Sequence, residues 1–263
     1  MLILLPPVLA LGAHYAIKWR VKSKKRRTPL TEKLLRSPGD SLRLQIDDLT
    51  EEITFFVSIG AAVPLFIYSV HLSQSYFLEV PEGQLRIMIS MLFGVAFCAY
   101  FVTRLAKLFN LRRRLRLGYD AELAVGQEIS RLMLDGCHVY HDFPAGRFNI
   151  DHIVVGPAGV FAVETKGRSK PTSGNGRSDA EVVYDGKSLR FPGRVETKAL
   201  DQASDNARWL RKWLSSALGE PIGVQPVVVL PGWFVKRVGP NGIPVLNPKL
   251  FPSFFANSKP LKP

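Results

Sequence analysis

Asp151, Glu164 and Lys166 have the residue types that hold a metal ion and act beside it. They lie on two apolar, β-branched stretches joined by the turn sequence Gly-Pro-Ala-Gly at 156–159, a pattern typical of a β-hairpin. Antiparallel pairing across this turn places Asp151 opposite Glu164, and the two-residue repeat of a strand puts Lys166 on the same face as Glu164. Two facing carboxylates repel each other unless a cation or a proton neutralises them. The pattern therefore points to a hard divalent cation, such as Mg²⁺, bound through carboxylate oxygens.

A simpler interpretation of the same residues stays open on spacing alone. Asp151 and Glu164 could be solvated charges at a sheet edge, with Lys166 as their salt-bridge partner. Apolar residues flank the acids on both faces of the strands, which is typical of central, covered strands and favours the metal site. The histidines are weaker candidates, because His138 and His141 lie three apart on a strand and so point to opposite faces.

The elements that would position these residues follow from the periodicity of the second half of the chain. Apolar residues recur there at helical spacing in two stretches, and shorter apolar or alternating stretches are bounded by Gly, Pro and Asp. A helix, then strands, then a helix and a strand predict an α/β fold with a mixed sheet flanked by helices. The expected helices are 118–136 and 196–218, and the expected strands are 137–143, 149–155, 160–166, 181–191 (a hairpin) and 224–230.

The first half of the chain has a different composition. Residues 53–70 carry no charged side chain, and residues 85–103 carry only one, near their start. Each stretch approaches the roughly 20 apolar residues that cross a bilayer, whereas a pair of buried core helices would need a larger core than this chain offers. A third stretch, at the N-terminus, is shorter and interrupted by prolines, and we interpret it as an uncleaved anchor. The sequence thus predicts membrane spans near residues 2–19, 53–72 and 85–103.

Charged residues beside these stretches predict an orientation. Basic blocks at 18–27 and 104–116 follow apolar stretches, whereas the connection 71–84 has two glutamates and no Lys or Arg. Lys and Arg concentrate on the cytoplasmic side, so residues 1–117 should form a multi-pass anchor in the cell (inner) membrane, and residues 118–263 a cytosolic domain. The formal net charge of +13 indicates an anionic partner, either the lipid bilayer or a nucleic acid.

One stretch resembles a known family. Residues 150–167, IDHIVVGPAGVFAVETKG, resemble the core of the NERD (nuclease-related) domain, itself similar to the restriction-endonuclease-like superfamily with its Asp…Glu-x-Lys signature. The resemblance extends over roughly 118–230 and includes Glu122 on the upstream helix and Gln202 on the downstream helix. The chain departs from the family in Ala121, where Gly is usual, and in the Gly- and Ser-rich loop after the lysine. The resemblance implies a restriction-endonuclease-like mixed sheet flanked by helices.

The resemblance also implies roles for the central residues. Asp151, Glu164 and the backbone carbonyl of Thr165 would bind Mg²⁺ or Mn²⁺, which polarises a phosphoryl oxygen and acidifies water. Lys166 would position that water and offset charge on the phosphate. The implied activity is hydrolysis of phosphodiester bonds in DNA or RNA.

Two helical residues receive roles only through the resemblance. Glu122 would be an accessory carboxylate, and Gln202 would reach a phosphate oxygen or the water; otherwise both are ordinary polar helix residues. Trp209 and Trp213, at helical spacing, are more typical of packing anchors than of base-stacking platforms. A fold does not establish an activity, so a catalytically silent, membrane-tethered module that binds nucleic acid or protein stays the alternative.

Overall fold

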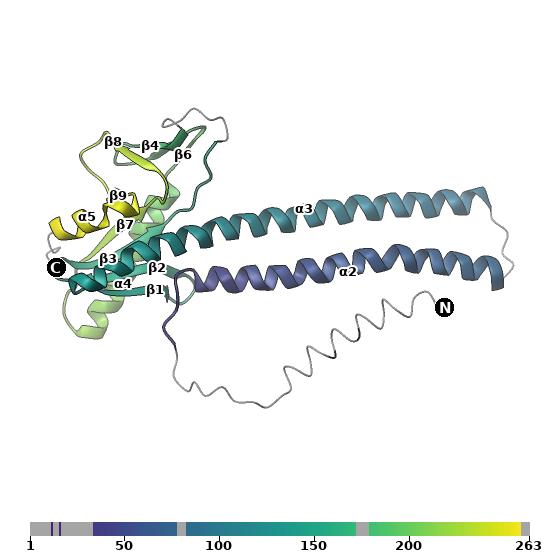
Figure 1. Ribbon diagram of the computed structural model, residues 1–263, viewed down its shortest axis with the longest axis horizontal. Coiled ribbons are helices and arrows are strands. Elements are labelled where there is room, and N and C mark those ends of the chain that lie inside the picture. The colour runs from purple at the N-terminus through teal and green to yellow at the C-terminus, as the bar shows by residue number, and fades with distance from the viewer. Residues whose placement is uncertain (1–11, 13–15, 17–33, 78–82, 172–178, 259–263) are drawn as a thin grey trace. The chain divides into compact units, whose positions relative to one another are not determined.

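The computed structural model divides the chain into two compact units (Figure 1). The first unit comprises Met1–Lys33 and Asp47–Arg112, and the second comprises Leu34–Ile46 and Arg113–Pro263. The predicted span near 2–19 lies outside the described part of the chain, apart from residues 12 and 16. The described residues are 12, 16, 34–77, 83–171 and 179–258.

Two long helices, α2 (Asp40–Phe77) and α3 (Gln84–Ile129), supply the described residues of the first unit. Within that unit the rings of Phe56 and Phe101 stack with their centroids 4.9 Å apart. A Cβ at Gly60 would lie 2.0 Å from the Phe101 ring, so glycine permits this close approach. The side chains of Arg104 and Glu52 form an ion pair at 3.0 Å.

Both helices are long and apolar enough to cross a membrane, judged by length and composition. Only 11% of the most apolar window of α2, and 0% of that of α3, is buried. A core helix of a soluble protein buries most of such a window, whereas these helices expose many large apolar side chains, among them Phe66, Leu92 and Phe93.

The longer of the two segments that form the second unit begins at Arg113, inside α3. A new helix was expected at Gly118, but residues 84–129 form one unbroken helix. No proline interrupts residues 84–129, and residues 104–117 are rich in Arg and Leu, which are strong helix formers. The predicted end at Gly136 is confirmed: a 3₁₀ turn, Ser130–Asp135, follows α3, and Gly136 closes it with φ of 80°.

A five-stranded mixed sheet, ordered β1-β2-β3-β7-β9, forms the centre of the second unit. Its first three strands are antiparallel, and β3, β7 and β9 are parallel. The predicted hairpin is confirmed, because Val155 pairs with Val160 and Ile153 with Ala162. The strands are β1 (His138–Pro144), β2 (Asn149–Gly156), β3 (Gly159–Thr165), β7 (Val224–Val229) and β9 (Val245–Leu246).

A second, four-stranded sheet has the order β6-β5-β4-β8. Its β4–β5 hairpin pairs Tyr184 with Leu189 around the predicted turn at Asp185 and Gly186. The other strands of this sheet were not expected from the sequence, because each has only three or four residues. The strands are β4 (Glu181–Tyr184), β5 (Leu189–Phe191), β6 (Arg194–Glu196) and β8 (Phe234–Arg237).

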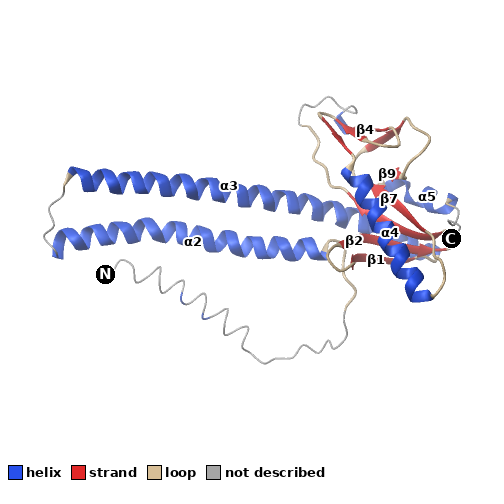
Figure 2. Ribbon diagram, turned by 180° about the vertical axis from the view of Figure 1, so that it is seen from behind, coloured by secondary structure: helices blue, strands red, loops and turns tan. Residues whose placement is uncertain are grey.

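Helices cover both faces of the five-stranded sheet, as predicted for an α/β fold. On one face lies α4 (Lys198–Leu218) (Figure 2). Its Ala207 and Leu210 belong to a buried cluster with Ile153 and Ala162. On the other face, the end of α3 and the short helix α5 (Phe251–Asn257) enclose a cluster around Val163. The central strand β3 is therefore covered on both faces, and polar residues at its end are held in a buried setting.

Candidate active site

Glu164 lies at the end of the central strand β3 and is only 1% exposed. Its two carboxylate oxygens have separate partners. Lys166 Nζ lies 2.5 Å from Oε1, and Asn206 Nδ2 donates to Oε2 at 2.7 Å. The amide of Lys166 donates to the carbonyl of Val229 at 2.9 Å, which continues the β3–β7 pairing and fixes the lysine backbone. Glu164 and Lys166 thus form the predicted pair on one face of the strand.

Asp151 approaches the same place from the neighbouring strand β2. The β2–β3 ladder runs as far as His152 and Val163, and the next position in this register sets Asp151 opposite Glu164. At this position the backbone amide of Thr165 donates to the side chain of Asp151, with 2.6 Å between the nitrogen and Oδ2. The side chain of Asp151 is therefore tied directly to the end of β3.

The helix α4 adds two amide side chains. Gln202 Oε1 accepts a hydrogen bond from Lys166 Nζ at 2.9 Å, and Asn206 holds Glu164. Residues four apart on a helix lie on the same face, so one turn of α4 contacts both members of the Lys166–Glu164 pair. Asn206 is 2% exposed and is a site residue that sequence reasoning missed. Its position one turn after Gln202 was the available signal.

Glu122, on α3, is the third acid of this group. It is 9% exposed, and burial raises its pKa to about 7, with further raising by the negative charges of Asp142 and Glu164. Lys166 acts in the opposite direction and lowers this pKa. Because this pKa lies near neutrality, the carboxyl group of Glu122 can both bind and release a proton near neutral pH.

The two strand acids are also perturbed. Burial raises the pKa of Asp151 well above its ordinary value, and the charges of Glu164 and Glu122 raise it further. Burial likewise raises the pKa of Glu164, against the opposing effects of Lys166 and Asn206. Three neighbouring buried acids would carry a surplus of negative charge if all were ionised, and either a proton or a cation relieves it.

The donor set fits a hard cation such as Mg²⁺ or Mn²⁺, which prefers carboxylate and carbonyl oxygens. The oxygens come from Asp151, Glu164 and Glu122, whose pKa values are raised mainly by burial and, for Asp151 and Glu122, also by neighbouring negative charge. Among the described residues, however, no three His, Cys, Asp or Glu side chains are already arranged around one ion position. Lys166 and Asn206 instead hold both oxygens of Glu164.

The part of the chain that holds these residues also matches a known protein family. The family profile of the nuclease-related domain (NERD) matches residues 117–231. This part of the chain is similar to the nuclease-related domain, and the term NERD domain below denotes residues 117–231. No curated protein and no solved structure matches the chain. The matched range confirms the resemblance found over 118–230, and every residue predicted for the site falls within it.

The NERD domain brings together every residue predicted for the site. Asp151 contacts Thr165, Lys166 contacts Glu164 and Gln202, and Glu122 interacts with Glu164 through its charge. The roles proposed for these side chains, and the metal ligation that includes the Thr165 carbonyl, stay predictions.

Asp142, on β1, is a second buried acid that sequence reasoning missed. It lies opposite Asp151 in the β1–β2 register, but its φ of 45° turns it out of the regular ladder. Asp tolerates this left-handed backbone better than most residues. Its carboxylate accepts hydrogen bonds from Ser41 Oγ at 2.6 Å, Arg36 Nη1 at 3.0 Å and Asn149 Nδ2 at 3.1 Å. A segment that precedes α2 and its first turn are thereby fixed to the NERD domain.

Arg168 continues the row of polar side chains beyond Lys166. Its guanidinium binds both oxygens of Glu196, at 3.0 and 2.5 Å, and its carbonyl accepts from Trp233 Nε1 at 3.1 Å. Its positive charge lowers the pKa of Glu164. This bidentate pair fixes the chain after the site to the end of β6. The sequence had offered Arg168 only as one of several basic residues that could contact a phosphate backbone.

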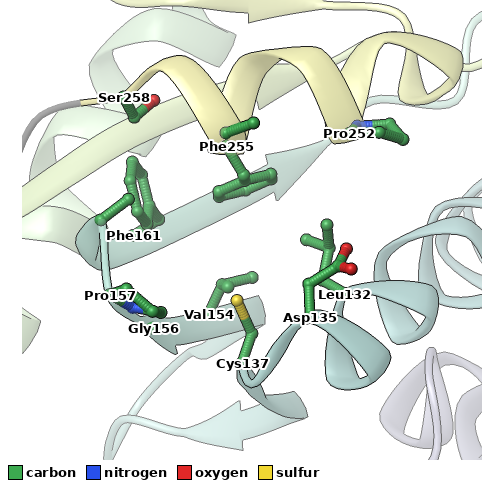
Figure 3. Close-up of a pocket in the computed structure, with 12 residues that line it drawn as sticks. Leu132, Asp135, Cys137, Val154, Gly156, Pro157, Phe161, Pro252, Phe255 and Ser258 are labelled. Atoms are coloured by element: carbon green, nitrogen blue, oxygen red, sulfur yellow. The ribbon is translucent and has the colours of Figure 1, made fainter.

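A pocket of about 490 Å³ lies elsewhere in the second unit, between the turn end of the β2–β3 hairpin and α5 (Figure 3). Val154, Phe161 and Phe255 line it with Cys137, whose thiol pKa is raised by burial. None of the predicted site residues lines this pocket. Because the acids lie at the opposite end of the hairpin, the pocket and the acidic site are separate features.

Proposed function

We propose that the NERD domain hydrolyses phosphodiester bonds in DNA or RNA with the help of a divalent metal ion. One observation carries the proposal: Glu122, Asp151 and Glu164 are gathered with raised pKa values around Lys166. Perturbed acids beside a lysine cluster at functional sites, because unbalanced buried charge costs stability. The match to the nuclease-related family supports this assignment.

Asp151, Glu164 and the main-chain carbonyl of Thr165 would hold the ion. When bound, Mg²⁺ or Mn²⁺ supplies Lewis acidity toward the phosphate. Lys166, whose ammonium already contacts Glu164, neutralises part of the charge that develops on the phosphate. Gln202 orients that ammonium by accepting its hydrogen bond.

Glu122 contributes proton transfer in this proposal. Its pKa of about 7 makes it an efficient proton acceptor at neutral pH, because the optimum for general base catalysis lies near the working pH. The water that attacks the phosphate would give its proton to this carboxylate. The departing oxygen of the strand would then take a proton from solvent.

The test uses the full-length protein in lipid nanodiscs with labelled DNA and RNA, in Mg²⁺, Mn²⁺ or chelator. Cleavage should need the ion and be lost in Asp151→Asn, Glu164→Gln and Lys166→Met. Asp205→Asn is the matched control, because Asp205 is an exposed acid on α4 paired with Arg208. Cleavage that survives the three site variants would belong to a contaminant and would remove the proposal.

One observation favours a second candidate, a silent binding module. Lys166 and Asn206 occupy both oxygens of Glu164, so the acid is already neutralised within the protein. On this hypothesis the domain binds nucleic acid or a protein without turnover. Salt-sensitive binding with no cleavage in either ion, under the conditions above, would select it.

We also propose that α2 and α3 cross a membrane and that the NERD domain lies in the cytoplasm. The support is their apolar, largely exposed windows and the Lys and Arg residues that follow the apolar part of α3. Reporter fusions within 71–84 and after Pro263 should report opposite sides of the membrane. Reporters on the same side would reject the pair of spans, whereas the span near 2–19 is tested by an N-terminal fusion.

A further inference from the structure

Four aromatic side chains form a cluster beside the site, at α4 and the β1–β2 turn. The rings of Trp209 and Trp213 lie nearly parallel, with an interplanar angle of 9° and centroids 6.2 Å apart. Phe148 packs edge-on against Trp209 at 5.7 Å, and Phe143 packs against Trp213 at 5.4 Å. The cluster is thus ordered by its own ring contacts.

Part of this cluster faces solvent. Trp213 is 45% exposed and Phe148 is 40% exposed, although both are large apolar side chains. Packing accounts for the inner rings, Trp209 and Phe143, which are half-buried. The outer two rings keep part of their surface open to solvent beside the inner pair, where a ligand could contact them.

The surroundings of the cluster are basic. Arg147 precedes Phe148 in the β1–β2 turn, and Lys212 precedes Trp213 on α4. Further exposed basic side chains lie on the same helix, namely Arg208 and Arg211. Aromatic rings interleaved with Lys and Arg are the arrangement that binds single-stranded nucleic acid, in which the rings stack on bases and the cations follow the phosphates.

The cluster is also continuous with the site. Gln202, Asn206, Trp209 and Trp213 are spaced by four, three and four residues, so they form one stripe along α4. The first two contact Lys166 and Glu164, and the last two carry the rings. The stripe is about 16 Å long at 1.5 Å per residue, so the acids and the rings lie within the reach of a short nucleic-acid strand.

We propose that Trp213 and Phe148 form a stacking platform for unpaired bases, so that the site takes single-stranded nucleic acid. The inference rests on the proposed function and names its substrate class. In a duplex the base faces are stacked on one another, and they become available to a protein ring only in an unpaired strand. The exposed basic residues would bind the phosphates of either form, so the rings supply the preference for the single strand.

The experiment measures binding without turnover. Full-length protein carrying Asp151→Asn, in nanodiscs of zwitterionic lipid, is titrated with a labelled single-stranded DNA and with its duplex. Trp213→Ala should raise the Kd for the single strand about tenfold, within the range for loss of one stacked base, and leave the duplex Kd unchanged. Trp213→Phe should restore most of the affinity, because it retains a π-face.

Two further variants separate stacking from charge. Lys212→Gln should weaken single-strand and duplex binding alike and lower the salt slope by about one, as expected for a phosphate contact. Phe234→Ala removes an exposed ring on β8 and should change neither Kd. If Trp213→Ala lowers the melting temperature, Phe148→Ala replaces it, with the same expected loss for the single strand.

Several results would overturn the platform. One is an equal loss of affinity for the single strand and the duplex, and another is no loss of affinity in either Trp213→Ala or Phe148→Ala. A third is quenching of Trp213 by brominated lipid while the single-strand affinity is unchanged, which would assign the rings to the bilayer surface. Trp213-dependent single-strand binding in a protein that never cleaves would remove the hydrolysis proposal and keep the platform. Cleavage together with a Trp213→Ala affinity equal to wild type would keep hydrolysis and remove the platform.

Discussion

The two units of this chain differ in the side chains that they expose and bury. In the first unit the apolar windows of α2 and α3 stay outside, with 11% and 0% of them buried. In the second unit acids are inside, and Glu164 is 1% exposed while carrying a carboxylate. Water alone favours neither arrangement, because it disfavours exposed apolar surface and rewards hydration of charge.

Under the proposals above, a different partner would complete each unit. Exposed apolar helices become favourable when lipid replaces water around them. Acids gathered in a buried site become favourable when a cation compensates their charge. The apolar helices are thus the observation behind the proposed membrane spans, and the buried acids are the observation behind the proposed cation site.

The largest expected effect tests the acidic unit. Asp151→Asn should lower the rate of cleavage by about 10²–10³-fold, the usual cost of losing one electrostatic group at a reacting centre. The same change should not lower the melting temperature in chelator, because the amide keeps the shape and removes a charge that Glu164 and Glu122 oppose. Asp205→Asn, the exposed control on α4, should change neither quantity.

A loss of both activity and stability in Asp151→Asn would break the comparison. It would mean that the hydrogen bond from Thr165 to Asp151 holds the hairpin together and that the acid is structural.

The second prediction concerns pH and Glu122. Its pKa is raised from 4.5 to about 7 in the folded protein, so the native state binds the proton more tightly than the unfolded chain does. Stability contributed by this proton is complete below pH 4.5 and is lost as pH rises toward about 7, by up to roughly 3 kcal/mol. Glu122→Gln should flatten this part of the profile, measured as melting temperature in chelator between pH 4.5 and 8.

Added Mg²⁺ sharpens the same measurement. An ion that binds only the folded protein raises its stability by mass action, and it does so most where the acids are ionised. The wild type should therefore gain melting temperature with Mg²⁺ at pH 8 and little at pH 5. An equal gain at both values would contradict a carboxylate site for the ion.

The third prediction concerns Asp142, which anchors the segment before α2. Asp142→Ala removes the acceptor of Arg36, Ser41 and Asn149, and should lower local stability by about 2–3 kcal/mol. Hydrogen exchange should become faster in the segments around Ser41 and in β1. Unchanged exchange around Ser41 would show that the segment is held by other contacts, such as Pro38 against Gly126.

The features that depend on residues close together in the sequence could be predicted. The turn at 156–159 and the two-residue period determine the β2–β3 register, so the meeting of Asp151, Glu164 and Lys166 followed from local rules. The place of Asn206 did not, because helix periodicity does not say which polar residue faces a strand far away in the chain. The family resemblance supplied Gln202 for the same reason.

Longer-range features were missed for physical reasons. The unbroken helix α3 passes through the expected start at Gly118, since hydropathy changes there while helix propensity does not. Asp142 gave no signal, because its burial depends on donors from Arg36 and Ser41, about a hundred residues earlier. Short strands such as β6 have too few residues to show a period.

The smallest expected effect compares two ion pairs of similar length. Arg104 and Glu52, in the first unit, are 3.0 Å apart and 46% and 49% exposed, whereas the Lys166–Glu164 pair is nearly buried. An exposed pair contributes little, because water and salt screen it and two long side chains lose freedom. Glu52→Gln should therefore change the free energy of unfolding by less than about 0.5 kcal/mol.

This small effect also locates the edge of the membrane. Glu52 directly precedes the predicted span at 53–72, so a negligible change would place the pair in the aqueous or headgroup region. A loss of several kcal/mol, measured by thermal unfolding in nanodiscs, would mean that the pair is shielded from water, since removing one partner leaves the other charge unpaired. In that case the span would begin before residue 53, and the first unit would also contain a buried charge pair, which would reduce the contrast with the second.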